Sequence, residues 1–113
     1  MNFPDNAEAI PKKDPRGAKV FLRKTTWEEH ICSNHPEMYN CLEEVLHTLM
    51  HPEKIYSYRD HRFSFRFSRK KGSFIMIIYK ISGTLGWVKT AYTVQNPYGE
   101  VEGYNRVWPI GKI

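Results

Sequence analysis

The sequence has few cysteines and no long apolar run. Its 2 cysteines, Cys32 and Cys41, suit neither a disulfide framework nor a C-x-x-C metal or redox site, so we expect two free thiols. No stretch approaches the roughly 18 apolar residues that a membrane-spanning helix needs, and the first twenty residues or so lack the apolar core of a secretory signal. These absences predict a cytoplasmic protein without a membrane partner.

Several chemical signatures are also missing. The chain has no glycine-rich phosphate loop and no serine in a nucleophile elbow, so nucleotide hydrolysis and acyl transfer have no support. His47 and His51 have the i, i+4 spacing of a helical metal pair, but the glutamate that would follow the first histidine and a third ligand are absent, and Pro52 ends the helix. We therefore expect neither a metal nor an organic cofactor.

The positive charge is concentrated in one segment. The formal net charge is +5, and residues 53–71 alone carry it, because their acids are only Glu53 and Asp60. The basic residues of this segment are Lys54, Arg59, Arg62, Arg66, Arg69, Lys70 and Lys71. Such a concentration predicts a polyanionic partner, either nucleic acid or an acidic protein. A solvated face that maintains solubility is the alternative.

Local patterns predict an N-terminal arm followed by helices. Residues 1–18 contain three prolines and little periodicity, which predicts a flexible arm before a single domain over 19–113. A short strand is expected over 19–24 and a helix from Trp27. Pro36 predicts a break at 34–35, because proline disfavours helical backbone angles in the residue before it. A second helix then ends before Pro52, and its apolar face is Met38, Leu42, Val45, Leu46 and Leu49.

After Pro52 the period changes from helical to alternating. Residues 61–67 alternate phenylalanine with arginine or serine, which predicts a half-buried strand, and the apolar run within 73–80 predicts a central strand. A further strand is expected over 87–94, and residues from 95 onward form an irregular tail. The predicted fold is α+β: two N-terminal helices pack on one face of an antiparallel four-stranded sheet. We expect that face to carry Phe63, Phe65 and Phe67.

The order of these motifs resembles a known nuclease superfamily. Trp27-x-x-His30-Ile31, then His35-Pro36-Glu37, an arginine-bearing strand and Lys89-Thr90-Ala91-Tyr92 are similar to phage-type nuclease domains of the barnase, EndoU, colicin and RelE (BECR) superfamily. The resemblance covers about residues 20–94. It implies cleavage of RNA without a metal, in a phage or toxin setting. The helical layer would supply a histidine or lysine, and the sheet an arginine and a hydroxyl.

The residues themselves are suited to that chemistry. Cleavage through the 2′-hydroxyl of RNA needs a base, an acid and donors around the phosphate, and histidine and arginine fill these roles at neutral pH. The candidate catalytic residues are His30, His35, Arg66, Thr90 and Tyr92. The candidate RNA-binding residues are Lys54, Arg59, Arg62, Arg69, Lys70, Lys71 and Lys89. Together they predict a metal-independent endoribonuclease that acts on single-stranded RNA.

Each candidate also has a plain structural interpretation. The histidines suit helix ends, the arginines suit a polar sheet face, and Thr90 and Tyr92 are ordinary strand residues. The alternative function is therefore a catalytically inactive protein of the same fold that binds RNA or an acidic partner, such as an antitoxin or immunity protein. A domain of a larger phage protein is a third possibility. Convergence of an imidazole and an arginine on one phosphate would favour the enzyme, and scattering of these groups would favour the binder.

Overall fold

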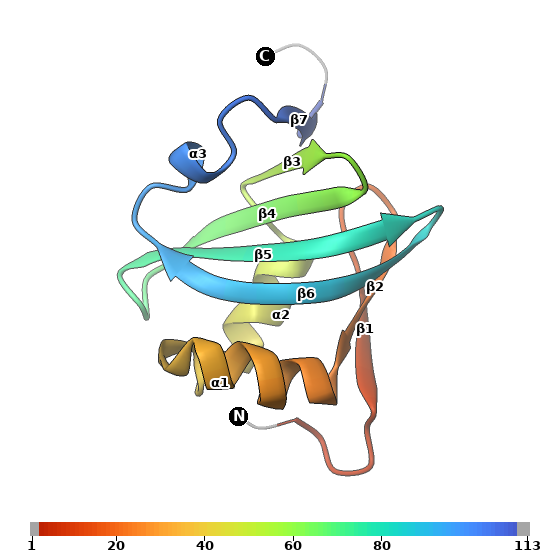
Figure 1. Cartoon of the computed structure of the whole chain (residues 1–113), viewed down its shortest axis with the longest axis vertical. Coiled ribbons are helices and arrows are strands. Elements are labelled where there is room, and N and C mark those ends of the chain that lie inside the picture. The colour runs from red at the N-terminus through yellow and green to blue at the C-terminus, as the bar shows by residue number, and fades with distance from the viewer. Residues whose placement is uncertain (1–2, 111–113) are drawn as a thin grey trace.

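A computed structural model describes residues 3–110, which form a mixed seven-stranded sheet with short helical segments (Figure 1). The strands are β1 (Ala9–Lys13), β2 (Lys19–Arg23), β3 (Lys54–Tyr58), β4 (His61–Ser68), β5 (Ser73–Ser82), β6 (Leu85–Val94) and β7 (Asn105–Trp108). Their order across the sheet is β1-β2-β6-β5-β4-β3-β7. The pair β2 and β6 is parallel, and the other neighbours are antiparallel.

The helical segments are short and interrupted. They are the π-helical turn η1 (Thr26–Ile31), α1 (Cys32–Asn34), the 3₁₀ turn η2 (Pro36–Met38), α2 (Leu42–Met50) and α3 (Pro97–Glu100). The break predicted before Pro36 is confirmed, since His35 has non-helical backbone angles, with φ −132° and ψ 76°. The second predicted helix is divided, because regular α-helix begins only at Leu42. Its five predicted apolar positions are all buried.

The predicted four-stranded antiparallel sheet is wrong. The antiparallel order β4-β5-β6 agrees with the predicted strands, but three further strands were missed. β1 lies within the segment expected as an arm, β3 follows Pro52, and β7 lies within the expected tail. These strands have four or five residues each and no clear alternation, and Pro11 is tolerated in β1 because β1 is an edge strand. The parallel pairing of β2 with β6 makes the sheet mixed.

The sheet is covered on both faces. We call the face of the sheet that packs against α2 the α2 face. Its residues Ile75, Ile77 and Tyr79 lie in one hydrophobic core with residues of α2. The aromatic face, which carries Phe65, Met76 and Tyr92, has a smaller core with Val101 from the C-terminal segment.

The phenylalanines of β4 occupy the aromatic face, so the prediction that the helices cover them is wrong. Phe63 and Phe65 pack there against residues of β5 and the C-terminal segment, whereas Phe67 is 44% exposed. Alternation identifies the residues that share a face, but it does not identify the layer that covers that face. Here the tail expected to be irregular supplies the cover.

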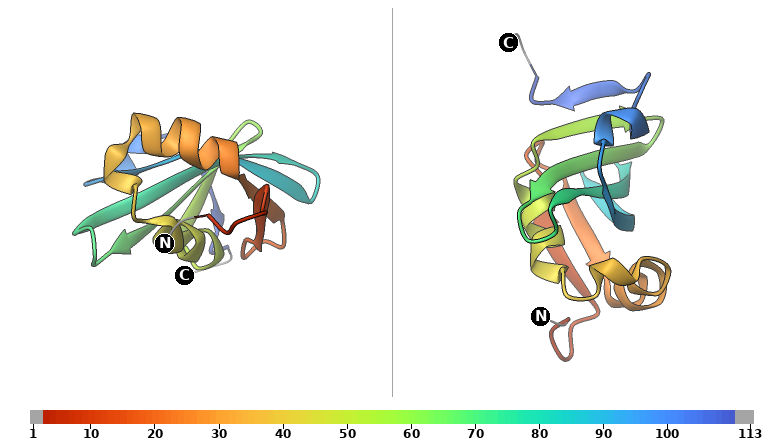
Figure 2. Two further views of the ribbon diagram at one scale, coloured as in Figure 1. Left: turned by 90° about the horizontal axis from the view of Figure 1, so that it is seen from below. Right: turned by 90° about the vertical axis from the view of Figure 1, so that its left-hand side faces the viewer.

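The segment η1–α1 lies along the outer edge of β6. β2 pairs with β6 only through residues 85–87, so the following part of that edge has no strand partner in the described chain. Figure 2 shows η1–α1 on one side of the sheet and α2 on the other. Trp27 and Ile31 are buried in the same core as α2, whereas His35 at the end of α1 reaches Tyr92 of the aromatic face.

Candidate functional site

His35 and Tyr92 form the centre of the candidate site. Their rings stack with centroids 5.4 Å apart and an interplanar angle of 29°. The His35 side chain is 35% exposed, so solvent and a ligand can reach the imidazole. The histidine is held there by the helix break, where its amide donates to the carbonyl oxygen of Ile31 over 2.8 Å. The structure thus brings together a residue of the predicted helix break and a residue of a predicted strand.

Glu37 fastens this helix break to β6. Its Oε2 accepts hydrogen bonds from the amide of Thr93 over 3.4 Å and from the hydroxyl of Thr93 over 3.2 Å. The same oxygen lies 3.9 Å from His35 Nδ1. Partial burial acts to raise the pKa of Glu37, but the hydrogen bonds from its own amide and from Thr93, together with the nearby His35, outweigh burial and lower it. A charged Glu37 therefore anchors the helix break to Thr93 and lies within ion-pair distance of the imidazole. Sequence analysis did not identify this role.

The Tyr92 hydroxyl is a neutral donor. It donates to Glu100 Oε1 over 2.9 Å. Burial raises the pKa of Tyr92 well above its usual range, and the hydrogen bond to the Glu100 carboxylate and its negative charge raise it further. Tyr92 therefore cannot serve as a base near neutral pH. Its hydroxyl could serve a ligand as a donor only by leaving Glu100.

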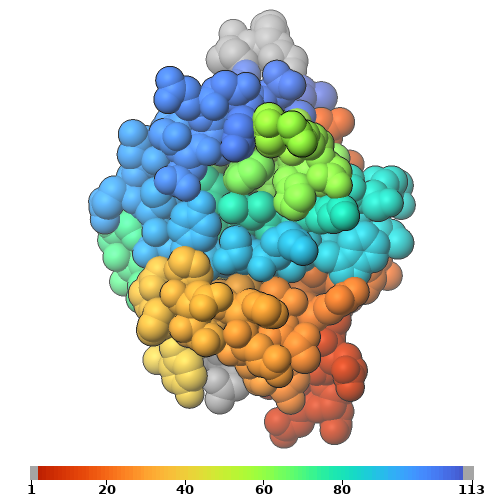
Figure 3. All heavy atoms as spheres, in the orientation of Figure 1, coloured from red at the N-terminus to blue at the C-terminus, as the bar shows by residue number. Residues whose placement is uncertain are grey.

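His30 and Lys89 lie on the same side of β6. Both side chains are exposed, and they line a shallow cavity of about 200 Å³ together with Thr26 and Val88. Lys89 is at a register shift, where Ile78 faces Thr90 and Tyr79 faces Val88 across the ladder. Thr90, which shares the aromatic face with Tyr92, follows Lys89 along β6. In Figure 3, atoms of β6 are visible in a band between η1–α1 below and α3 above.

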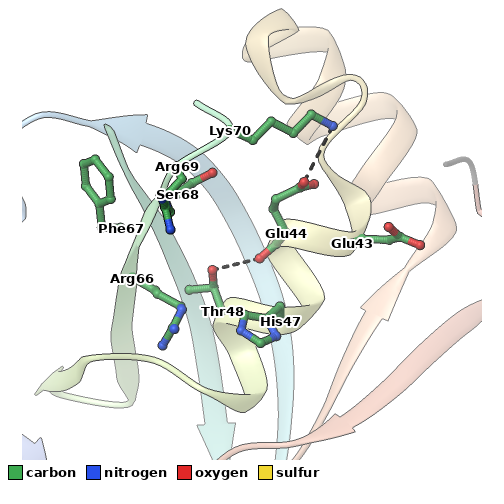
Figure 4. A pocket seen from close by; sticks show the side chains of 9 residues that line it. All are labelled: Glu43, Glu44, His47, Thr48, Arg66, Phe67, Ser68, Arg69 and Lys70. Carbon is green, nitrogen blue, oxygen red and sulfur yellow. Dashed lines mark hydrogen bonds and ion pairs between the residues drawn. The ribbon is translucent and has the colours of Figure 1, made fainter. Parts of the chain in front are cut away.

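Arg66 lies on the α2 face, away from this site. It pairs with Ile75 of the α2 core across the ladder, and its Nη1 donates to the carbonyl oxygen of His51 over 2.8 Å. Arg66, Arg69 and Lys70 line a groove of about 370 Å³ between α2 and β4 (Figure 4). The ammonium group of Lys70 is 3.6 Å from a Glu44 carboxylate oxygen. These cations therefore face acids of α2 rather than the imidazole of His35.

Arg62 also points to the α2 face, where it neutralises a buried acid. Its Nη1 donates to Asp14 Oδ2 over 2.9 Å, and the side chains are 17% and 0% exposed, respectively. Tyr79 donates to the same oxygen over 2.7 Å, and burial and this carboxylate raise the pKa of Tyr79 far above its usual range. Oδ1 accepts from the amides of Arg16 and Ala18. No pattern in the sequence singled out Asp14.

The remaining predicted cations are dispersed. The ammonium group of Lys54 contacts the Tyr98 hydroxyl over 2.8 Å, and the guanidinium carbon of Arg59 lies 5.2 Å from the centre of the Tyr58 ring. The ammonium group of Lys71 donates to the carbonyl oxygen of Glu37. The basic segment therefore spreads over both faces of the sheet. Concentration in sequence does not produce one basic surface, because alternate strand residues point to opposite faces.

The predicted site thus divides into two groups. His35 stacks on Tyr92, and His30 and Lys89 line a second position along β6, whereas Arg62 and Arg66 extend from the α2 face of β4.

His47 and His51, which have the spacing of a helical metal pair, have no third ligand grouped with them in the described part of the chain. The rings of His47 and His51 are 5.0 Å apart, and within residues 3–110 no three acidic, cysteine or histidine side chains are grouped as metal ligands would be. In the same part of the chain, none of the helices combines the length and apolar character needed to cross a membrane.

The groups along β6 offer imidazole, ammonium and hydroxyl chemistry at an accessible surface. No family model, curated protein or solved structure matches the chain, so these groups are the basis for assigning a function.

Proposed function

We propose that the protein is a metal-independent endoribonuclease that cleaves single-stranded RNA at the site along β6. The observation that supports this proposal is the exposed His35 imidazole, which is stacked on Tyr92 of the face that also carries Thr90. Two further groups suited to this reaction, His30 of η1 and Lys89 of β6, line one cavity beside the same strand. The proposed site needs no metal ion.

In the proposed reaction, the RNA supplies its own nucleophile. A basic imidazole removes the proton of the 2′-hydroxyl, the 2′-oxygen bonds to phosphorus, and the bond from phosphorus to the 5′-oxygen breaks. An acidic group protonates the departing 5′-oxygen, which leaves a 2′,3′-cyclic phosphate. His35 and His30 are the candidates for base and acid, and one such group typically contributes about 10²- to 10⁴-fold in rate. Thr90 would donate to the phosphate and Lys89 would balance its charge.

A second candidate function is favoured by the positions of the arginines, because Arg62 and Arg66 do not converge with the imidazole of His35. Arg62 and Arg66 are engaged on the α2 face, so the fork of donors that arginine offers to a phosphate is not supplied by either of them. The Tyr92 hydroxyl is already bonded to Glu100. This arrangement fits a protein that binds RNA or an acidic partner protein without cleaving RNA.

Cleavage of a fluorescently labelled single-stranded RNA in excess EDTA tests the proposal. His35→Ala should lower the rate by about 10² or more, whereas RNA affinity should change little, because proton transfer acts mainly in the transition state. His47→Ala is the matched control: His47 is an exposed histidine beside the α2 groove, and its loss should leave the rate unchanged.

The product and the substrate provide further tests. The product should carry a 2′,3′-cyclic phosphate, and a substrate with deoxyribose at the scissile position should be inert. If wild-type protein binds RNA but cleaves no faster than His35→Ala, the nuclease proposal fails and the binding function replaces it.

A further inference from the structure

One end of the aromatic face carries a continuous row of side chains across five strands. The row consists of Phe21 on β2, Trp87 on β6, Lys80 on β5, His61 on β4 and Tyr58 on β3. Each member faces the next directly across the ladder. Residues in such register pairs lie side by side on one face of a sheet. The stacking row, as we call these five residues, therefore forms one surface.

The aromatic members of the stacking row are accessible. The rings of Phe21 and Trp87 stack on each other with centroids 6.4 Å apart and an interplanar angle of 24°, and both side chains are half-buried. Tyr58 is 46% exposed, although Tyr104 stacks on it with centroids 4.7 Å apart. Phe65 on the same face is fully buried. The accessible aromatic platform is therefore the pair formed by Phe21 and Trp87.

Cations surround this platform. The ammonium group of Lys19 lies 5.8 Å from the centre of the Phe21 ring, and Lys80 is paired with Trp87 in the ladder. Asp60 partly neutralises Lys80, because a carboxylate oxygen of Asp60 lies 3.7 Å from the Lys80 ammonium group, and another lies 2.9 Å from His61 Nδ1. Accessible aromatic rings beside cations are the combination that binds single-stranded nucleic acid, because the rings stack on bases and the cations attract the backbone.

The platform also lies close to the proposed reacting groups. Across the ladder Trp87 faces Lys80 and Thr90 faces Ile78, which are two residues or about 7 Å apart along β5, and both residues face the aromatic side. A base stacked on Trp87 would therefore belong to a nucleotide near the one held at Thr90. A duplex would be a poor ligand, because its bases are already stacked on one another.

We propose that Phe21 and Trp87, with Lys19 and Lys80, form a base-stacking subsite that selects single-stranded RNA and positions it for the site along β6. The inference rests on the proposed function for the identity of its ligand. It names the part of the substrate that is recognised, a base outside the scissile linkage. It also gives the physical reason why duplexes are excluded.

Binding of an uncleavable probe tests the subsite separately from catalysis. The probe is a labelled single-stranded 2′-O-methyl oligonucleotide, and its affinity is measured by fluorescence anisotropy beside that of the same sequence as a duplex. Stacking on one aromatic residue contributes about 1–3 kcal/mol. Trp87→Ala and Phe21→Ala should therefore each weaken single-strand binding by about 5- to 150-fold. Trp87→Phe should retain most of the affinity, since it retains a ring.

The matched control is Phe67→Ala. Phe67 is a 44% exposed phenylalanine on the same face, six residues along β4 from His61 and so about 20 Å from it. Its loss should leave affinity unchanged, and circular dichroism spectra identify any variant that fails to fold. Equal binding of duplex and single strand, or binding that survives Trp87→Ala, overturns the subsite even if RNA is cleaved. Binding that depends on Trp87 without any cleavage overturns the nuclease proposal and leaves the subsite intact.

Discussion

Replacing Asp14 with alanine should strongly destabilise the protein. Asp14 is a fully buried carboxylate between β1 and β2, and it accepts hydrogen bonds from Arg62, Tyr79 and two backbone amides. Through these bonds the turn after β1 is attached to β5 and β4, which lie two and three strands away from β2, respectively, in the sheet order. The perturbation therefore affects contacts between the β1–β2 turn and two central strands rather than one hairpin.

The expected magnitude follows from the groups that lose their partner. The Arg62 side chain is only 17% exposed, and Tyr79 is fully buried, so neither can be well hydrated in place of Asp14. Removing one member of a buried ion pair costs about 3–5 kcal/mol, since the remaining charge is left uncompensated. For a domain of about this size, 1 kcal/mol shifts Tm by about 4–8 °C. The variant should therefore melt about 12–40 °C lower.

Urea unfolding followed by tryptophan fluorescence measures the effect. The matched control is Asp60→Ala, because Asp60 forms ion pairs at 52% exposure, where solvent screening leaves little net stabilisation. Adding Arg62→Met to Asp14→Ala should restore at least about 1 kcal/mol, since it removes the unpaired charge. A loss below about 1 kcal/mol for Asp14→Ala, or no recovery in the double variant, would refute the reasoning.

Three further predictions concern stability and the site. The pKa of Glu37 is lowered in the folded protein, so the contribution of its charge to stability is present above its ordinary pKa of 4.5 and is lost as pH falls through the lower folded value. In acid titrations followed by circular dichroism, Glu37→Gln should therefore lose less stability over that pH range than the wild type. Phe65→Ala should cost about 3–5 kcal/mol in urea unfolding, because Phe65 is fully buried on the aromatic face; a cost below 1 kcal/mol would contradict that packing. Arg66→Ala should leave the rate of RNA cleavage unchanged, because Arg66 lies on the α2 face; a hundredfold loss would contradict the assignment of the site.

The strongest local patterns predicted the central elements well. The alternation in residues 61–67 and the apolar run within 73–80 identified β4 and β5, and Pro36 identified the break between α1 and η2. These signals depend on backbone geometry and side-chain period, which act over a few residues. The same break placed His35 at the site along β6.

The weakly patterned segments could not be assigned in this way. β1 and β7 are short edge strands, and their stability depends on pairing with β2 and β3 rather than on their own residues. Pairing of this kind is a long-range property, which a local window does not contain. The number of strands and the mixed sheet were therefore missed together.

The sequence by itself determined which residues share a face of β4 and where the helices break, because these properties follow from the period of the backbone. Only the tertiary structure decided which layer covers each face. The C-terminal segment covers Phe65, and Arg62 turns to the buried Asp14. This packing places Arg62 and Arg66 on the α2 face of the sheet, and it places Tyr92, with His35 stacked on it, on the aromatic face. The physical reason is that burial is shared among distant segments, whereas alternation describes one strand at a time.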